Sequence, residues 1–83
     1  MEELKSRVLR CANKVSGKSL SIPDHQDLPL EAFHFDSLST FAFMIELENE
    51  FGVSLDETLF AGEEMKTVGS TASMIARVNP QAG

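Results

Sequence analysis

Residues 37–51 carry apolar side chains on two separate faces of one predicted helix, and this pattern constrains the fold most. Successive residues lie about 100° apart around a helix, so side chains three or four positions apart share a face. One face holds Thr40, Phe43, Met44, Leu47 and Phe51, and the other holds Leu38, Phe41 and Ile45. Asp36 precedes the segment as a predicted N-cap, and Gly52 is placed to end it. The first face fits the core of a helical fold, whereas the core alone does not account for the second face.

Two further segments each carry a single apolar stripe and are predicted to form the other main helices. The stripe of residues 2–16 consists of Leu4, Val8, Cys11, Ala12 and Val15. The stripe of residues 68–78 consists of Val68, Thr71, Ala72, Ile75 and Val78. Gly17 is placed to end the first of these helices, and Thr67 is placed to cap the start of the second.

The segments between these helices predict one short helix and one long loop. Ser54-Leu55-Asp56-Glu57 has the spacing of a capping box, which predicts a short helix near residues 55–61. Residues 18–35 have no sustained period but contain several apolar side chains, so we expect a long loop pinned to the core. Within it we expect one helical turn at Leu30–Phe33, and no stretch alternates like a strand. The predicted fold is therefore all-α: a small bundle of three main helices plus one short helix, in a single domain spanning 1–83.

The charge distribution narrows the range of partners. The 83 residues carry a formal net charge of −6, yet five of the seven basic residues lie within the first 18 positions. The acidic remainder should repel nucleic acid and anionic membranes and attract basic protein surfaces. No apolar run approaches the roughly 20 residues of a membrane span, so we expect no membrane insertion. The N-terminus has no signal-peptide core, and we expect a cytoplasmic monomer.

Conventional catalysis has little support in the residues. His34 stands three positions before Ser37, so a serine–histidine hydrolase is one hypothesis, but no motif supplies an oriented base or an oxyanion hole. Cys11 belongs to an apolar stripe and is interpreted as a small core residue. Glu46, Glu48 and Glu50 alternate along a helix and do not converge, so we predict no metal site. Ser37 is better interpreted as a place where a group is attached by another protein.

The face formed by Leu38, Phe41 and Ile45 allows two interpretations. Either the long loop covers these side chains, or they form a docking patch for another protein. Ser37 lies between the two apolar faces of the helix, so a group bonded to it would lie beside such a patch.

The motif Phe35-Asp36-Ser37-Leu38, followed by a helix that ends Ile-Glu-Leu-Glu-Asn-Glu-Phe-Gly, resembles the acyl carrier proteins. The segment Val53-Ser54-Leu55-Asp56-Glu57 and the triplet Lys66-Thr67-Val68 also resemble that family, and the resemblance covers residues 2–79. It implies that Ser37 carries 4′-phosphopantetheine through a phosphodiester. A separate phosphopantetheinyl transferase, using coenzyme A and a divalent metal, would install it. The thiol of the arm would then hold acyl groups as thioesters for partner enzymes.

The same resemblance implies roles for the neighbours of Ser37. Asp36 would cap the helix and take part in transferase recognition. The apolar part of the docking surface would consist of Leu38, Phe41 and Ile45, and Glu48 would add an acidic contact on the same side. Acyl-loading and acyl-processing enzymes would bind this surface through basic and apolar patches.

Several residues depart from the common pattern of the family. His34 replaces a glycine that usually stands two residues before the aspartate, and Ser39 and Ala42 replace acids. Phe41 and Phe43 are bulkier than the usual aliphatic residues. These departures favour a specialised carrier in a dedicated fatty acid, lipid or polyketide-type pathway. An unmodified module that keeps the carrier fold and docks partners through Leu38, Phe41 and Ile45 is the alternative.

Overall fold

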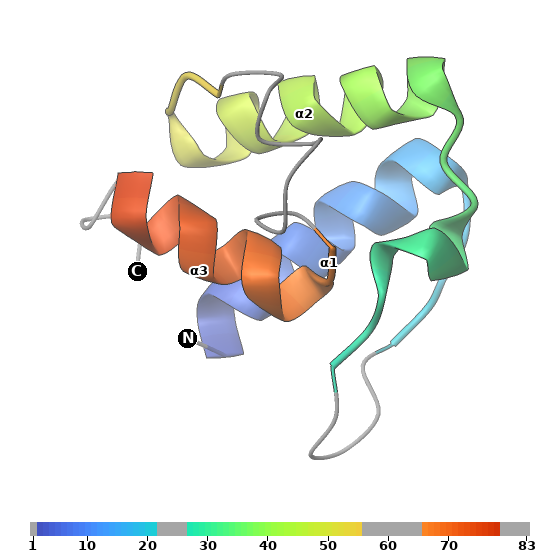
Figure 1. Cartoon of the computed structure of the whole chain (residues 1–83), viewed down its shortest axis with the longest axis horizontal. Helices are drawn as coiled ribbons and strands as arrows, with labels where there is room; N and C mark the ends of the chain where they lie inside the picture. The colour runs from blue at the N-terminus through green and yellow to red at the C-terminus, as the bar shows by residue number, and fades with distance from the viewer. Residues whose placement is uncertain (1, 22–26, 56–65, 79–83) are drawn as a thin grey trace.

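The computed structural model describes residues 2–21, 27–55 and 66–78, and this part of the chain is helical (Figure 1). In chain order the elements are α1 (Glu2–Ser16), the 3-10 turn η1 (Leu30–Phe33), α2 (Ser37–Phe51) and α3 (Val68–Val78). The described residues contain no strand, only one isolated bridge between Pro29 and Thr67. The predicted all-α fold, its three main helices and the turn in the long loop are confirmed. The short helix predicted near 55–61 lies outside the described residues.

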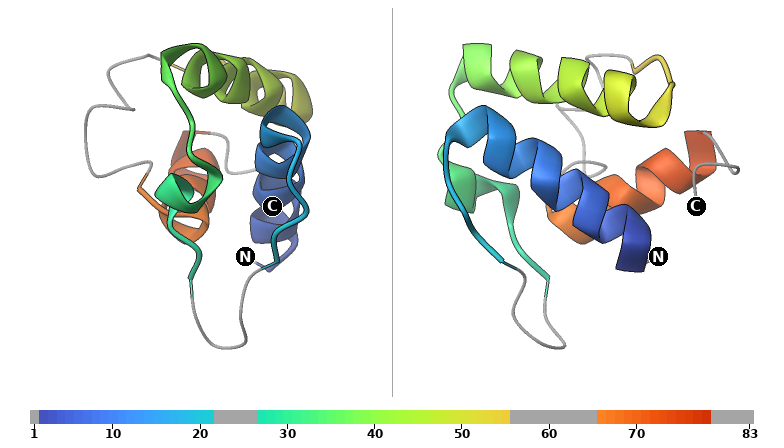
Figure 2. Two further views of the ribbon diagram at one scale, coloured as in Figure 1. Left: turned by 90° about the vertical axis from the view of Figure 1, so that its right-hand side faces the viewer. Right: turned by 180° about the vertical axis from the view of Figure 1, so that it is seen from behind.

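The core lies where the apolar stripes of the three helices meet. Helix α1 packs against both α2 and α3, and Figure 2 shows α2 lying across the other two. The side chains buried from the helices are Leu4, Val8, Cys11 and Ala12 of α1; Phe43, Met44, Leu47 and Phe51 of α2; and Val68, Thr71, Ala72, Met74 and Ile75 of α3. The first apolar face of α2 is therefore the core face, as predicted.

The end of α3 differs from the predicted stripe. Val78 was assigned to the buried stripe but is 46% exposed, whereas Met74 is only 1% exposed. Met74 lies beside Thr71 and Ile75 on the helix surface, so the buried face is wider than a narrow stripe. Val78 is the last residue of α3, and its neighbour Arg77 is exposed as well.

Both ends of the long loop are held by hydrogen bonds. The side chain of Asn13 donates to the carbonyl of Leu20 and accepts from its N–H, at 2.9 and 3.0 Å. Further along, the N–H of Leu30 donates to the carbonyl of Lys66, and the N–H of Val68 donates to the carbonyl of Leu28. The end of the loop before η1 therefore runs beside the start of α3, and the burial of Leu30 and Phe33 in the core confirms the predicted attachment for the described part of the loop.

The loop also supplies a cap for α3 through Asp27. Its carboxylate accepts hydrogen bonds from the Thr67 hydroxyl at 2.6 Å and from the N–H of Gly69 at 2.8 Å. Burial raises the pKa of Asp27, but hydrogen bonds from Thr67, Gly69 and Leu28 outweigh that effect and lower it below its ordinary value. A Cβ atom on Gly69 would stand 2.5 Å from the carboxylate, so this close approach requires glycine.

Ion pairs join α1 to α2 along one seam. The guanidinium of Arg7 donates to the Glu50 carboxylate at 2.7 Å and lies 4.5 Å from the ring centre of Phe51. Lys14 pairs with Glu46 at 3.3 Å. The basic residues of the N-terminal helix therefore neutralise acids of the central one, which accounts for part of the uneven charge along the sequence.

Candidate functional site

The first residue of α2 is Ser37, and Asp36 caps the helix as predicted. The Asp36 carboxylate accepts a hydrogen bond from the Ser39 N–H at 2.7 Å, and its carbonyl accepts one from Thr40. The hydrogen bond from the Ser39 N–H, together with one from the Ser39 hydroxyl, lowers the pKa of Asp36 below its ordinary value. Ser37 is exposed beside this cap, at the positive end of the helix dipole.

Three stacked phenylalanine rings pack around the segment that leads into α2. The rings of Phe33 and Phe35 are 5.5 Å apart between centres, and those of Phe35 and Phe43 are 5.2 Å apart. Phe33 and Phe43 are buried, so the half-buried ring of Phe35 is held between two core residues. The sequence motif included Phe35 but gave no signal for this stack, because Phe43 lies outside the motif, as the seventh residue of α2.

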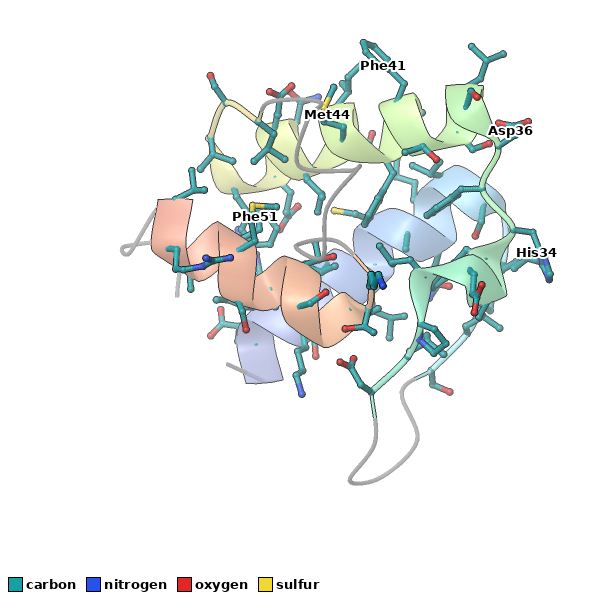
Figure 3. The ribbon with its side chains drawn as sticks, in the orientation of Figure 1. His34, Asp36, Phe41, Met44 and Phe51 are labelled. Atoms are coloured by element: carbon teal, nitrogen blue, oxygen red, sulfur yellow. The ribbon has the colours of Figure 1, made fainter. Side chains whose placement is uncertain are left out.

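His34 holds the chain in a left-handed turn between η1 and α2. Its φ is 56°, and its N–H donates to the carbonyl of Glu31 at 3.1 Å. Glycine adopts that conformation without steric cost, and glycine is also the residue that the resemblance to acyl carrier proteins leads us to expect at this position. The exposed imidazole points away from the helices (Figure 3). Within the described part of the chain, no hydrogen bond joins it to Ser37, so the serine–histidine hypothesis gains no support from the geometry.

Leu38, Phe41 and Ile45, here termed the apolar ridge, lie on the outer side of α2. They are 83%, 51% and 42% exposed, respectively. Figure 3 shows Phe41 pointing away from α1 and α3. The interpretation that the long loop covers these side chains is therefore wrong, because all three remain exposed to solvent.

Glu48 lies farther along α2 and is half-buried. Its carboxylate accepts a hydrogen bond from the N–H of Leu55 at 2.7 Å. The same carboxylate was predicted to contact partner proteins, and that role stays a prediction. Among the residues that the structure describes, no group of three or more histidine, cysteine or acidic side chains is arranged to hold a metal ion.

Cys11 is a core residue, as predicted. Its side chain is 4% exposed, and burial, together with the carboxylates of Glu50 and Glu46, raises the pKa of the thiol to about 11. At neutral pH the thiol is therefore protonated and unreactive.

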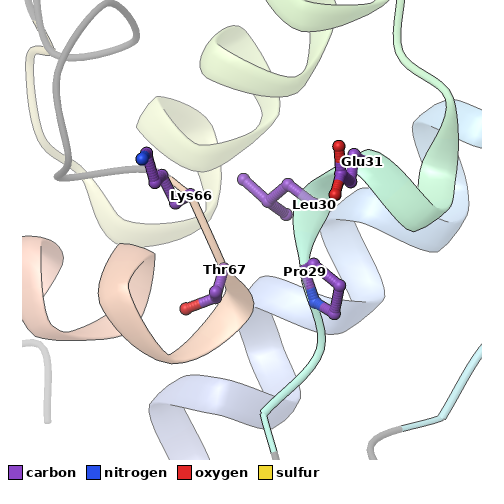
Figure 4. Close-up of a pocket in the computed structure, with 5 residues that line it drawn as sticks. All are labelled: Pro29, Leu30, Glu31, Lys66 and Thr67. Carbon is purple, nitrogen blue, oxygen red and sulfur yellow. The ribbon is translucent and has the colours of Figure 1, made fainter.

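One open pocket lies between the long loop and the start of α3. It measures about 450 Å³ and is lined by Pro29, Leu30, Glu31, Lys66 and Thr67 (Figure 4). The hydroxyl in the lining, that of Thr67, donates a hydrogen bond to the Asp27 carboxylate and so belongs to the cap of α3. No helix in the described segments is both long and apolar enough to cross a membrane.

Comparison with known protein families assigns the chain to one of them. The family model for the phosphopantetheine attachment site matches residues 6–75. Neither the curated proteins nor the solved structures gave a significant match. Members of the matched family are non-catalytic carriers with covalently attached 4′-phosphopantetheine, and they generally interact with phosphopantetheinyl transferases and acyl-processing enzymes. The chain therefore belongs to the phosphopantetheine attachment site family, which includes the acyl carrier proteins, and it is a carrier and not an enzyme.

Proposed function

We propose that Ser37 is the residue to which 4′-phosphopantetheine is attached. The observation that carries this proposal is the exposed Ser37 hydroxyl on the first residue of α2, directly after the Asp36 cap, in a chain of this family. The hydroxyl is accessible to a second protein. The Asp36 carboxylate bonds to the N–H of Ser39, and the aromatic stack packs Phe35, two residues before Ser37, against α2.

The site also suits the charge of the arm. A phosphodiester on Ser37 would carry a negative charge at the N-terminal end of α2, where free N–H groups and the helix dipole favour anions. No residue next to Ser37 needs to act as a base, since the transferase supplies the base and the divalent metal. The bound arm supplies a thiol on which acyl groups are held as thioesters.

The departures of Ser39, Phe41, Ala42 and Phe43 from the common family pattern support a proposal about the kind of pathway. We propose a specialised carrier for fatty acid, lipid or polyketide-type biosynthesis, acting as a cytoplasmic monomer. Asp36, Leu38, Phe41, Ile45 and Glu48 are proposed to contact the transferase and the enzymes that load or process the acyl group. The support for this surface is the exposure of the apolar ridge immediately beside Ser37.

Mass spectrometry tests the attachment directly. Incubation of the purified chain with coenzyme A, Mg²⁺ and a broad-specificity transferase should add the mass of one phosphopantetheine. Ser37→Ala should abolish the addition, whereas Ser39→Ala, a matched change two residues away, should retain it. A chain that gains no mass, or gains it despite Ser37→Ala, would contradict the proposal.

The exposed apolar ridge also fits the alternative of an unmodified docking module. That function predicts that Ser37→Ala leaves binding to partner proteins and function in cells intact, while Phe41→Asp abolishes both. Loss of function with Ser37→Ala in a folded chain would reject the alternative.

A further inference from the structure

None of residues 37–42, with which α2 begins, is buried. The first core residue of the helix is Phe43, and Leu38, near the start, is 83% exposed. Burial of apolar side chains therefore contributes little to the stability of this first part of α2. A helix end without such packing tends to fray, because its first N–H groups have no partner within the helix.

The cap at Asp36 opposes this fraying. Its carboxylate accepts a hydrogen bond from the Ser39 N–H at 2.7 Å, and its carbonyl accepts one from the Thr40 N–H at 2.9 Å. Both bonds depend on the position of the Asp36 backbone, but the residue itself is exposed. The cap can therefore hold the first turn of α2, residues 37–40, only if the chain that leads to Asp36 is held as well.

Phe35 is the residue that holds this connecting chain, which runs from η1 to α2 (Figure 1). Its ring stacks on that of Phe33 with the planes 11° apart and on that of Phe43 with the planes 26° apart, and both of these partners are buried. Of the three residues that connect η1 to α2, His34 and Asp36 are exposed, and only Phe35 packs against the core. The stack is therefore the side-chain contact that ties the cap to the body of the protein.

We propose that Phe35 is a positioning residue for the loading of Ser37. Its stacked ring holds the Asp36 cap, and through the cap the first turn of α2, in the conformation that the transferase binds. The inference rests on the proposed function, because it concerns how the attachment residue is presented. An enzyme that binds only the formed turn has an apparent affinity reduced by the fraction of molecules in which that turn is formed.

Loading kinetics and NMR spectroscopy of the whole chain test this role. Backbone chemical shifts of residues 37–40 give the fraction of molecules in which the first turn is formed. Transfer from coenzyme A by a broad-specificity transferase with Mg²⁺ gives kcat and KM. Phe35→Ala removes both stacked contacts and should lower the formed fraction and kcat/KM about threefold or more. The two decreases should match in size, with the loss in KM and not in kcat.

Two further substitutions of Phe35 separate the aromatic ring from its volume. Phe35→Tyr keeps the stacked ring on a half-buried side chain and should load within about twofold of wild type. Phe35→Leu keeps much of the apolar volume but loses the stacking, and it should fall between the tyrosine and alanine variants.

Glu50→Gln is the matched control for overall stability. It weakens the ion pairs of Glu50 with Arg7 and Arg10 and should lower the melting temperature. It should change the formed fraction and kcat/KM by less than about twofold, because exposed ion pairs contribute weakly and these lie on the seam between α1 and α2. All loading is measured at a temperature at which circular dichroism shows every variant folded.

The possible outcomes separate this inference from the proposed attachment. If wild type gains no phosphopantetheine, the proposed attachment fails, and this inference fails with it. If wild type is loaded and Phe35→Ala is loaded equally well, only the positioning role is overturned. Slower loading of Phe35→Ala with an unchanged first turn would make Phe35 a contact of the transferase and would also overturn positioning. An equal loss of loading in Glu50→Gln would do the same, because overall stability would then be the cause.

Discussion

The carboxylate of Glu48 accepts a hydrogen bond from the backbone N–H of Leu55 at 2.7 Å, across the turn that ends α2. Gly52 makes that turn in the left-handed conformation, with φ of 66°, and its N–H bonds to the carbonyl of Glu48. Leu55 is buried, so its amide is shielded from water and needs an acceptor. Glu48 therefore anchors the chain that leaves α2.

Removal of the Glu48 acceptor should destabilise the fold. We expect Glu48→Ala to lower the free energy of unfolding by about 1–2 kcal/mol, because it leaves the Leu55 amide without its partner. Glu48→Gln keeps an oxygen in the same place and should cost less than half as much. Urea denaturation of both variants measures the difference. Equal losses would show that the charge of Glu48, and not its hydrogen bond, matters.

Asp27 and Gly69 should show a strong energetic coupling. Gly69→Ala alone should destabilise the protein by about 0.5–2 kcal/mol, because the new Cβ displaces the capping carboxylate. Asp27→Ala should cost a similar amount. In the Asp27→Ala background the clash is gone, and Gly69→Ala should become stabilising by up to about 1 kcal/mol through its better helix propensity. A double-mutant cycle checks this change of sign, and simple additivity would contradict the close contact.

Acid should destabilise the folded chain by protonating three carboxylates. The pKa values of Asp27, Asp36 and Glu50 are lowered in the folded chain relative to ordinary values of 3.8 for aspartate and 4.5 for glutamate. A lowered folded-state pKa means that the stabilisation is complete above these ordinary values and is lost as the pH falls through the folded-state values. The melting temperature should therefore hold steady from pH 7 to about pH 5 and fall below about pH 4.

Asp27→Asn provides the matched variant for this pH dependence. It should be less stable than wild type at pH 7 but should lose less stability on acidification, because one of the three titrating groups is gone. Parallel curves for the two proteins would show that Asp27 does not contribute to acid unfolding.

His34 should tolerate glycine better than any β-branched residue. Its φ of 56° lies in the left-handed region, which costs non-glycine residues about 1 kcal/mol. We expect His34→Gly to be neutral or to raise stability by up to about 1 kcal/mol, and His34→Val to lower it. Thermal unfolding of the two variants tests the order, and a more stable valine variant would contradict the left-handed turn.

Cys11 should report unfolding through its thiol. Because the thiol is buried and its pKa is raised to about 11, a thiol reagent at pH 8 should modify it only when α1 separates from α2. The labelling rate should therefore rise steeply with urea. Immediate labelling of the native chain would show that the thiol is accessible.

The helices and the candidate site were predictable because their signals are local. The apolar stripes give the three helices, and Asp36, Gly17 and Gly52 give their ends, since caps depend on residues within a turn of one another. Ser37 was found from its motif and its place at the start of α2. The second apolar face was predicted as well, but the exposure of Phe41 was not, because the long loop was an equally plausible cover until the structure showed the side chain exposed.

The contacts that join distant segments were not predictable from one sequence. Asp27 meets Gly69 across 42 positions, and Arg7 meets Glu50 across 43. No periodicity encodes such pairs, because they arise only after the helices pack. Gly69 illustrates the difference. Glycine is a poor helix former, and only the close approach of Asp27 explains why this position of α3 is glycine.

The stacked rings of Phe33, Phe35 and Phe43 have a consequence for how cargo travels. They attach Phe35, the residue before the Asp36 cap, to Phe43 on the core face of α2, so the turn that leads to Ser37 is packed against the same helix that carries the apolar ridge. An enzyme bound to the ridge then meets the root of the proposed arm at a constant distance and direction. The reach of any group on the proposed arm would thus be set by the motion of the arm about its attachment point, and enzymes that dock on the ridge in the same way would find that group within the same volume.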